Sequence, residues 1–252
     1  MSEPLRVAAA VEGPTDAIVL RAVLDRLLGN AEFEFQTLQP EGSAVFGSAP
    51  FGKTGMGWGG VYRWARQSAA EGGGSVAGSS VLSNHDLLIV HVDADVAGTT
   101  YASAGIRHPP CQDLPCEGDC PPAEQTTNAL RTVVLRWLGL GRSVPRLILC
   151  TPSKNTEAWV IAALWPDNPV MLRGDWECHP HPEGQLRALP LARRIRKRAT
   201  DYRAKQGEIT ATWPSVSAQC AEAARFDQEF RTALPRVRTS ASPETDSPPQ
   251  TS

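Results

Sequence analysis

The sequence lacks any stretch of about 18 consecutive apolar residues, the length at which a membrane-spanning helix becomes a candidate. Its first residues, MSEPLRVAAAVEG, contain an early acidic residue and no long apolar segment, so we expect no secretory signal. The six cysteines are few and unevenly spaced, which argues against a disulfide framework. We therefore expect a protein without a membrane association, in the reducing environment of the cytoplasm.

The chain also lacks a strong overall charge, because its formal net charge is only −2. Overall charge therefore predicts no polyanionic partner, and the local distribution of charge carries more information. With 252 residues, of which 41% are hydrophobic, the chain is long enough for one α/β domain with an appendage.

Apolar runs and helix-periodic segments alternate along the first part of the chain. Short apolar or alternating segments predict strands, and segments with apolar residues at helical spacing predict helices. The expected strands are 5–11, 32–38, 86–92 and 147–150, and the expected helices are 16–29, 61–70, 123–138 and 155–164. This order predicts an α/β fold with a mostly parallel sheet and helices on both faces.

The composition divides the chain into three parts. Residues 1–170 form the expected α/β domain, with a Cys- and Pro-rich insert at 96–122 and a glycine-rich, flexible segment at 71–80. Residues 171–234 form a basic helical extension. Residues 235–252 contain little apolar material, so we expect a disordered tail.

The segment GSAPFGKT, from Gly47 to Thr54, has the spacing of a phosphate-binding P-loop. In a P-loop NTPase, Lys53 and Thr54 would bind the nucleotide and Asp93 would hold its magnesium. A P-loop requires a helix that begins at its lysine, however, and TGMGWGG follows Lys53. Each glycine costs a helix about 1 kcal/mol relative to alanine. We therefore favour a loop in which Lys53, Arg63 and Arg66 meet a polyanion, with a P-loop and a plain surface loop as alternatives.

Carboxylates follow two of the predicted strands. Glu12 and Asp16 follow the first strand, and Asp93 and Asp95 follow the strand at 86–92. Ligands of open α/β sheets bind at the carboxyl ends of strands, where these side chains would converge. Converging carboxylates repel one another unless a cation neutralises them, and oxygen ligands suit Mg²⁺ or Mn²⁺. The sequence therefore predicts a metal site at this edge.

The two motifs, EGPTD from Glu12 to Asp16 and DAD from Asp93 to Asp95, resemble those of the Toprim domain. This domain occurs in topoisomerases, primases and nucleases of the overcoming-lysogenization-defect type. The segment TPSKNTEAWVIAAL at 151–164 is similar to a third element of small Toprim-like proteins of defence systems. The resemblance covers about residues 5–165 and implies a Toprim-like, Rossmann-like sheet. The insert, which lies within this range, and the basic extension match no Toprim pattern.

The resemblance also implies an activity, namely Mg²⁺- or Mn²⁺-dependent cleavage of phosphodiester bonds in DNA or RNA by a defence or toxin-like effector, with a protein of the same system as a further partner. Glu12 would act as general acid/base or metal ligand, and Asp93 and Asp95 would hold magnesium. Asp16 and Glu157 would complete a second metal site, and Lys154 would neutralise the phosphate. Asp16 and Glu157 can equally be first-turn helix acids favoured by the macrodipole.

Four potential zinc ligands lie in the insert, within RHPPCQDLPCEGDCPP. His108, Cys111, Cys116 and Cys120 can hold Zn²⁺ as a Cys₃His set. Their spacing matches no common zinc finger, so we favour ordinary reduced cysteines on a loop.

The segment LARRIRKRATDYRAK at 191–205 is strongly basic. Leu191, Ile195, Ala199 and Tyr202 recur at helical spacing, which predicts a helix with one packed face. Its cationic faces suit a phosphate backbone, with a solvated charged surface as the alternative. The candidate nucleic-acid ligands here are Arg193, Arg194, Lys197 and Arg198. A non-catalytic nucleic-acid-binding module that uses this segment alone is a third possible function.

Overall fold

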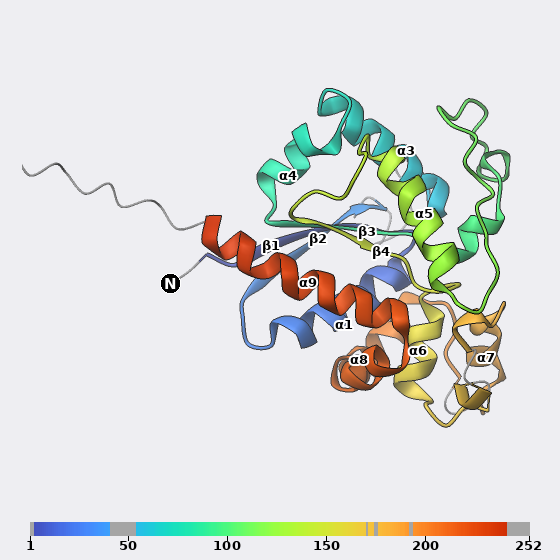
Figure 1. Ribbon diagram of the computed structural model, residues 1–252. Helices are drawn as coiled ribbons and strands as arrows, with labels where there is room; N and C mark the ends of the chain where they lie inside the picture. The colour runs from blue at the N-terminus through green and yellow to red at the C-terminus, as the bar shows by residue number, and fades with distance from the viewer. Residues whose placement is uncertain (1–2, 41–53, 170, 174–175, 192–193, 241–252) are drawn as a thin grey trace, which may run out of the picture.

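The computed structural model describes residues 3–40, 54–169, 171–173, 176–191 and 194–240. Within these ranges, four parallel strands form one sheet in the order β2-β1-β3-β4 (Figure 1). The prediction of an α/β fold with a parallel sheet is confirmed. The strands are β1 (Leu5–Ala10), β2 (Phe33–Gln39), β3 (Leu87–His91) and β4 (Leu147–Cys150).

Alternate side chains of the central strands sort the helices onto two faces of the sheet, because successive residues of a strand point to opposite sides. Val7 and Ile89 belong to a core with helices α1, α6, α8 and α9, whereas Ala8 and Leu88 belong to a core with α3, α4 and α5 (Figure 1). The helices are α1 (Pro14–Leu28), α3 (Gly57–Glu71), α4 (Ser80–Asn84), α5 (Glu124–Trp137), α6 (Glu157–Leu164), α7 (Pro182–Ala188), α8 (Ala199–Gln219) and α9 (Ala221–Ser240). Helices on both faces are thus confirmed.

The C-terminal helices share a core with the sheet. Trp213 of α8 and Phe230 of α9 are buried in the same cluster as Val7 of β1. The Trp213 ring also meets Trp159 of α6 edge-on, with 5.3 Å between the ring centroids. The extension is therefore held to the α/β part by ordinary hydrophobic burial.

The expectation of a disordered tail from residue 235 is wrong for its first part, because α9 continues to Ser240. Once a helix is nucleated, each further residue adds a hydrogen bond at little cost, and the buried Phe226 and Phe230 anchor this one. Residues 241–252 lie outside the described ranges.

The segment at 71–80, expected to be flexible, contains close backbone contacts, although most of its residues are exposed. It contains a 3₁₀ turn, Val76–Gly78, whose Val76 is fully buried, and α4 begins at its end. A Cβ atom on Gly139 would lie 1.9 Å from the carbonyl oxygen of Gly74. The glycines therefore allow two backbones to approach, which composition alone did not reveal.

The predicted basic helix is also shorter at its start than expected. Helix α8 begins at Ala199, and residues 194–198 are not helical. The Asp201 carboxylate accepts the backbone N–H of Arg196, 3.1 Å away, in competition with a continuous helix. Ile195 and Tyr202 are buried and Ala199 packs against the core, whereas Leu191 is 77% exposed. Three of the four predicted apolar residues therefore pack, but not from one continuous helix.

The glycine-rich segment before α3 falls partly outside the described residues, which resume at Thr54. Helix α3 begins at Gly57 and not directly at Lys53. Inside it, a Cβ atom on Gly60 would lie 2.3 Å from Nε2 of the buried Gln39 and 2.6 Å from the Gly55 carbonyl oxygen. Because Gly60 has no side chain, helix α3 can pack closely against Gln39 and the Gly55 backbone.

No helix in the described ranges is long and apolar enough to cross a membrane.

Candidate functional site

The carboxyl ends of β1 and β3 are joined by a side-chain contact. Glu12 follows β1 and Asp93 follows β3, and these parallel strands pair directly. Oε1 of Glu12 accepts the backbone N–H of Asp93 at 2.9 Å. The two residues with the strongest motif resemblance are therefore in contact, as the strand-end argument predicts.

The Asp93 carboxylate is held by the loop after β4. Its Oδ1 accepts hydrogen bonds from the backbone N–H of Thr156, at 3.1 Å, and from the Thr156 hydroxyl, at 3.2 Å. His91 Nε2 lies 2.8 Å from the same hydroxyl oxygen and 3.4 Å from Asp93 Oδ1. Burial lowers the pKa of His91 to about 3, so its ring is neutral. His91 and Thr156 were not predicted as site residues, although His91 stands at the end of an apolar strand in the sequence.

Asp16 and Glu157 lie in the first turns of α1 and α6, and both are buried. Asp16 is 3% exposed and Glu157 is 1% exposed. Within the described residues, Asp16 Oδ1 and Glu157 Oε2 have no hydrogen-bond partner. An acid that served only the helix macrodipole would have no need of burial, so these two side chains call for a ligand or another charge.

Burial and mutual repulsion raise the pKa values of these carboxyl groups. Burial, then the charge of Asp16, raises the pKa of Glu12 to about 8, against the opposing hydrogen bond from Asp93. Burial raises the pKa of Asp16, and burial followed by the charges of Glu12 and Asp16 raises that of Asp93. The pKa of Asp95, which is exposed at the rim, rises to about 6 through partial desolvation and the charge of Glu157. Glu12, Asp16, Asp93, Asp95 and Glu157 form a carboxylate cluster. These pKa shifts indicate that the cluster contains too little positive charge to balance its carboxylates.

Lys197 of the basic segment supplies a positive charge to this cluster. Its Nζ lies 3.1 Å from Oε1 of Glu157, which also accepts the Tyr202 hydroxyl at 2.9 Å. Desolvation opposes the charged form of Lys197, but the carboxylates of Glu157 and Asp16 outweigh it and raise its pKa. The positive charge of Lys197 in turn partly offsets the rise in the pKa values of Glu12, Asp16 and Asp95, which remain raised overall. Lys197 was predicted to bind a nucleic acid, whereas in the structure its ammonium group is paired with the Glu157 carboxylate.

Three helices begin beside these carboxylates. Helix α1 begins at Pro14, α6 begins at Glu157, and the first N–H of α3, at Gly57, donates to the Glu12 carbonyl at 2.9 Å. The positive ends of helix dipoles favour anions, which include both carboxylates and phosphates. The edge therefore combines oxygen ligands with donors that suit a phosphate group.

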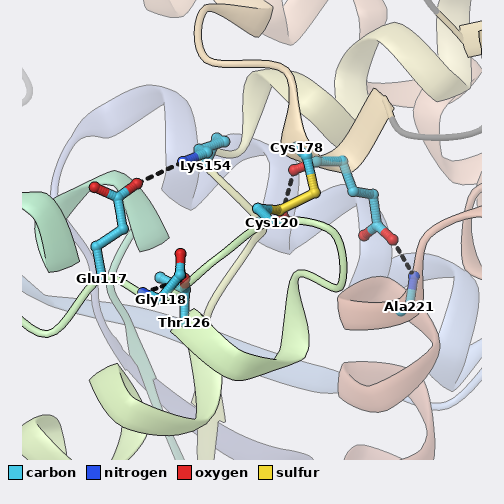
Figure 2. The surroundings of a disulfide bond; sticks show 9 residues. Glu117, Gly118, Cys120, Thr126, Lys154, Cys178 and Ala221 are labelled. Atoms are coloured by element: carbon cyan, nitrogen blue, oxygen red, sulfur yellow. Dashed lines mark hydrogen bonds and ion pairs between the residues drawn. A yellow bond between two sulfur atoms is a disulfide. The ribbon is translucent and has the colours of Figure 1, made fainter.

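Lys154 points away from this cluster toward the insert. Its Nζ lies 2.8 Å from Glu117 Oε1 (Figure 2). Its carbonyl oxygen accepts the N–H of Asp95 at 2.9 Å. The structure therefore brings the Lys154 backbone into contact with Asp95, and the ammonium group, although paired with Glu117, still acts through its charge on Asp95 and opposes the rise of its pKa.

A disulfide joins the insert to the C-terminal extension. Cys120 is bonded to Cys178, across 58 residues (Figure 2). Glu117, three residues before Cys120, pairs with Lys154, and the carbonyl of Glu177, next to Cys178, accepts the Ser153 hydroxyl. The disulfide thus links the two segments that contact the loop at 151–156, which leads to Glu157.

This disulfide corrects two expectations about the insert. The Cys120 sulfur is bound to Cys178, so the Cys₃His set of His108, Cys111, Cys116 and Cys120 is not assembled. The cysteines are not all reduced either, although Cys111 and Cys116 are free. Among the described residues, no group of three or more His, Cys, Asp or Glu side chains is arranged to hold a metal ion.

Four of the remaining basic candidates, Arg63, Arg66, Arg194 and Arg198, lie within the described residues. The Arg63 guanidinium donates to the carbonyl oxygens of Thr54 and Gly59, each at 3.0 Å, and so stabilises the start of α3. Arg66 is partly buried, and Arg194 and Arg198 are exposed. Lys53 and Arg193 lie outside the described residues.

No protein-family model matches the chain, and no curated protein or solved structure matches it. Its function must therefore be argued from the site itself.

Proposed function

We propose that this chain is a Toprim-like phosphodiesterase that cleaves nucleic acid with Mg²⁺ or Mn²⁺. One observation carries the proposal: Asp16 and Glu157 hold buried, unpartnered carboxylate oxygens beside the Glu12–Asp93 contact. A buried acceptor without a partner costs about 1–3 kcal/mol, and more when it is charged. Such a cost is expected where a ligand or a cation completes the arrangement.

The donor set fits a hard cation. Glu12, Asp16, Asp93 and Glu157 offer only oxygen atoms, which Mg²⁺ and Mn²⁺ prefer, and Asp95 stands at the rim. The type of ligand atom suits these cations, whereas the described side chains are not arranged as a group of three ligands around one metal position. A bound cation would polarise the phosphate and lower the pKa of an attacking water molecule.

The residues of the chain have separable roles in this proposal. Glu12, whose pKa is raised toward neutrality, can accept or return a proton at its carboxylate. Thr156, supported by the neutral His91, fixes the orientation of the Asp93 carboxylate. The starts of α1, α3 and α6 favour the phosphate group itself.

The polymeric substrate and the setting are further parts of the proposal. The exposed side chains of Arg194, Arg196 and Arg198 lie beside Lys197 in sequence, where they can draw in a phosphate backbone. A defence or toxin-like role and a partner protein of the same system follow only from the resemblance to Toprim-like proteins. The cytoplasmic location is proposed from the expected lack of a secretory signal and from the few, unevenly spaced cysteines.

One observation favours a second candidate, a non-catalytic nucleic-acid-binding module. Lys197 already neutralises part of the carboxylate cluster, so the fold can exist without a metal. In such a module the exposed arginines would bind the backbone and the carboxylates would be structural.

A cleavage assay separates the two candidates. Supercoiled plasmid, linear DNA and RNA are incubated with Mg²⁺, with Mn²⁺ and with EDTA. The nuclease produces metal-dependent products that Asp93→Asn abolishes, whereas Asp167→Asn, which changes an exposed aspartate after α6, leaves them. Salt-sensitive binding without products from any substrate would support the binding module instead.

A further inference from the structure

The segment that precedes α8 is fixed on both sides of Lys197. Ile195 is 5% exposed within the core, and the Asp201 carboxylate binds the backbone N–H of Arg196. The N–H of Arg198 donates to the Arg196 carbonyl at 2.7 Å. The backbone therefore presents Lys197 at a defined place beside the carboxylates.

The side chain of Lys197 differs from its partner in access to water. The Lys197 side chain is 52% exposed, whereas that of Glu157 is 1% exposed. Its ammonium group thus lies at the boundary between solvent and the buried cluster. A flexible lysine stem can leave such a position by rotation of its own bonds, without movement of the backbone.

The electrostatic influence of Lys197 extends over the whole candidate site. Its charge acts on Glu12, Asp16 and Asp95 as well as on Glu157. These are the carboxylates that a divalent cation would use. An ammonium group and a divalent cation repel each other strongly at such short range, so both are not favoured there together.

We propose that Lys197 is an internal counter-ion of the carboxylate cluster, and that a divalent cation displaces its ammonium group from Glu157. The inference rests on the proposed function in taking this cluster as a metal site. Lys197 is then a residue that sets metal affinity, and its displacement frees the Glu157 carboxylate and exposes a lysine at the rim of the site.

The first test measures Mn²⁺ affinity by calorimetry. Lys197→Gln should bind Mn²⁺ roughly tenfold more tightly than the wild type, because a competing positive charge is gone. Lys197→Arg, which keeps the charge, should stay within a few-fold of the wild type. Lys205→Gln is the matched control: it removes the same charge from a lysine that pairs with Glu208 on α8, and it should change nothing.

The second test uses the wild-type protein and so does not depend on the folding of a variant. Amine acetylation of each lysine is followed by mass spectrometry, in EDTA and in Mn²⁺. Lys197 should be acetylated several-fold faster in Mn²⁺, because the freed amine is more accessible, while the rate at Lys205 should not change. Equal rates at Lys197 in both conditions would overturn the inference, as would an Mn²⁺ affinity of Lys197→Gln that equals or falls below that of the wild type.

The two proposals fail in different ways. If Lys197→Gln binds Mn²⁺ more tightly as expected but no nucleic acid is cleaved, the nuclease proposal is wrong and the counter-ion proposal stands. Metal-dependent cleavage with no change in affinity at Lys197 would keep the nuclease and remove the counter-ion.

Discussion

Glu12 and Asp93 are in direct contact across the carboxyl ends of two neighbouring strands, through a 2.9 Å hydrogen bond from the Asp93 N–H to Glu12 Oε1. The contact orients one oxygen of Glu12 and brings its charge close to that of Asp93. The pKa of Glu12 therefore depends on the folded structure, because burial of the site and the neighbouring charges determine it.

The first prediction concerns pH and stability in EDTA. The pKa of Glu12 in the folded protein, about 8, lies above its ordinary value of 4.5, so the folded state binds this proton more tightly than the unfolded state. The resulting stabilisation is fully present below pH 4.5 and is lost as the pH rises toward 8. Asp16, Asp93 and Asp95 act in the same direction because their pKa values are also raised. His91, whose pKa is lowered to about 3, acts in the opposite direction up to its ordinary value of 6.5. The melting temperature should therefore fall most clearly between pH 6.5 and pH 8.

Glu12→Gln should reduce this fall, because it removes one of the groups that loses its proton, and it should be the more stable protein near pH 8. Glu34→Gln, at an exposed position on β2, is the control and should follow the wild type. Parallel melting curves for wild type and Glu12→Gln from about pH 5 to pH 8 would contradict the account.

The second prediction concerns the disulfide. Cys120→Ser removes a cross-link that spans 58 residues, and the chain-entropy account assigns such a loop about 4 kcal/mol of stability. The variant should melt several degrees lower. Hydrogen exchange should accelerate at residues 151–156, because Glu117 and Glu177, close to the two cysteines, contact this loop. Cys111→Ser, at an exposed free cysteine, should change neither quantity.

The same bond tests the expected compartment. Thiols are alkylated at the moment of lysis, before oxidation by air, and Cys120 is assayed by mass spectrometry. A cytoplasmic protein in a reducing cell should show alkylated Cys120, and it should then have the looser loop of the serine variant. Protection of Cys120 would argue for an oxidising compartment.

The third prediction concerns the start of α3. Gly60→Ala should destabilise the protein by about 1–3 kcal/mol, because the new methyl group would collide with Gln39 and with the Gly55 carbonyl. Gly141→Ala, where a Cβ atom meets nothing within 4 Å, should be close to neutral. Chemical denaturation measures both, and equal stabilities of the two variants would show that Gly60 has no packing role.

Much of this fold could be predicted from the sequence because its strands are continuous apolar runs. Residues 86–92 contain LLIVH, which is buried at every position of β3, as expected for a central parallel strand. Glu12 and Asp93 could be placed at one edge because parallel strands end together. That reasoning required only strand ends, and it needed no information on distant contacts.

The features that the sequence did not reveal depend on distant or competing contacts. No local pattern relates Lys197 to Glu157, or Cys120 to Cys178, and the connectivity of cysteines does not follow from their spacing. The helix at 191–205 looked continuous by its period, but Asp201 binds the backbone of Arg196 and ends that continuity. At 71–80 the glycines indicated flexibility, whereas Gly72 and Gly78 allow close approach of their own backbones, and Gly139 allows that of Gly74.

The fourth prediction concerns nucleic-acid binding. Replacement of both Arg194 and Arg198 by alanine should weaken binding and reduce the salt slope of log K by about two, one for each lost phosphate contact. All sequences should be affected alike, because backbone contacts carry no base information. Arg142→Ala, at an exposed position before the amino end of β4, should leave the slope unchanged. Anisotropy titrations across a salt series measure all three proteins, and an unchanged slope in the double variant would remove this segment from the interface.

The most direct test of the central claim is the single-turnover rate of nucleic-acid cleavage in Mn²⁺ by Asp16→Asn, compared with Asp167→Asn. Asp16 is buried with an unpartnered oxygen beside Glu12, and its replacement keeps the shape of the side chain while removing its charge. If this edge of the sheet is the metal-dependent site, the rate should fall by about 10- to 100-fold, the scale on which metal sites respond to the loss of a supporting carboxylate. Asp167→Asn should cleave like the wild type. Cleavage by Asp16→Asn at the wild-type rate would contradict the assignment of the site.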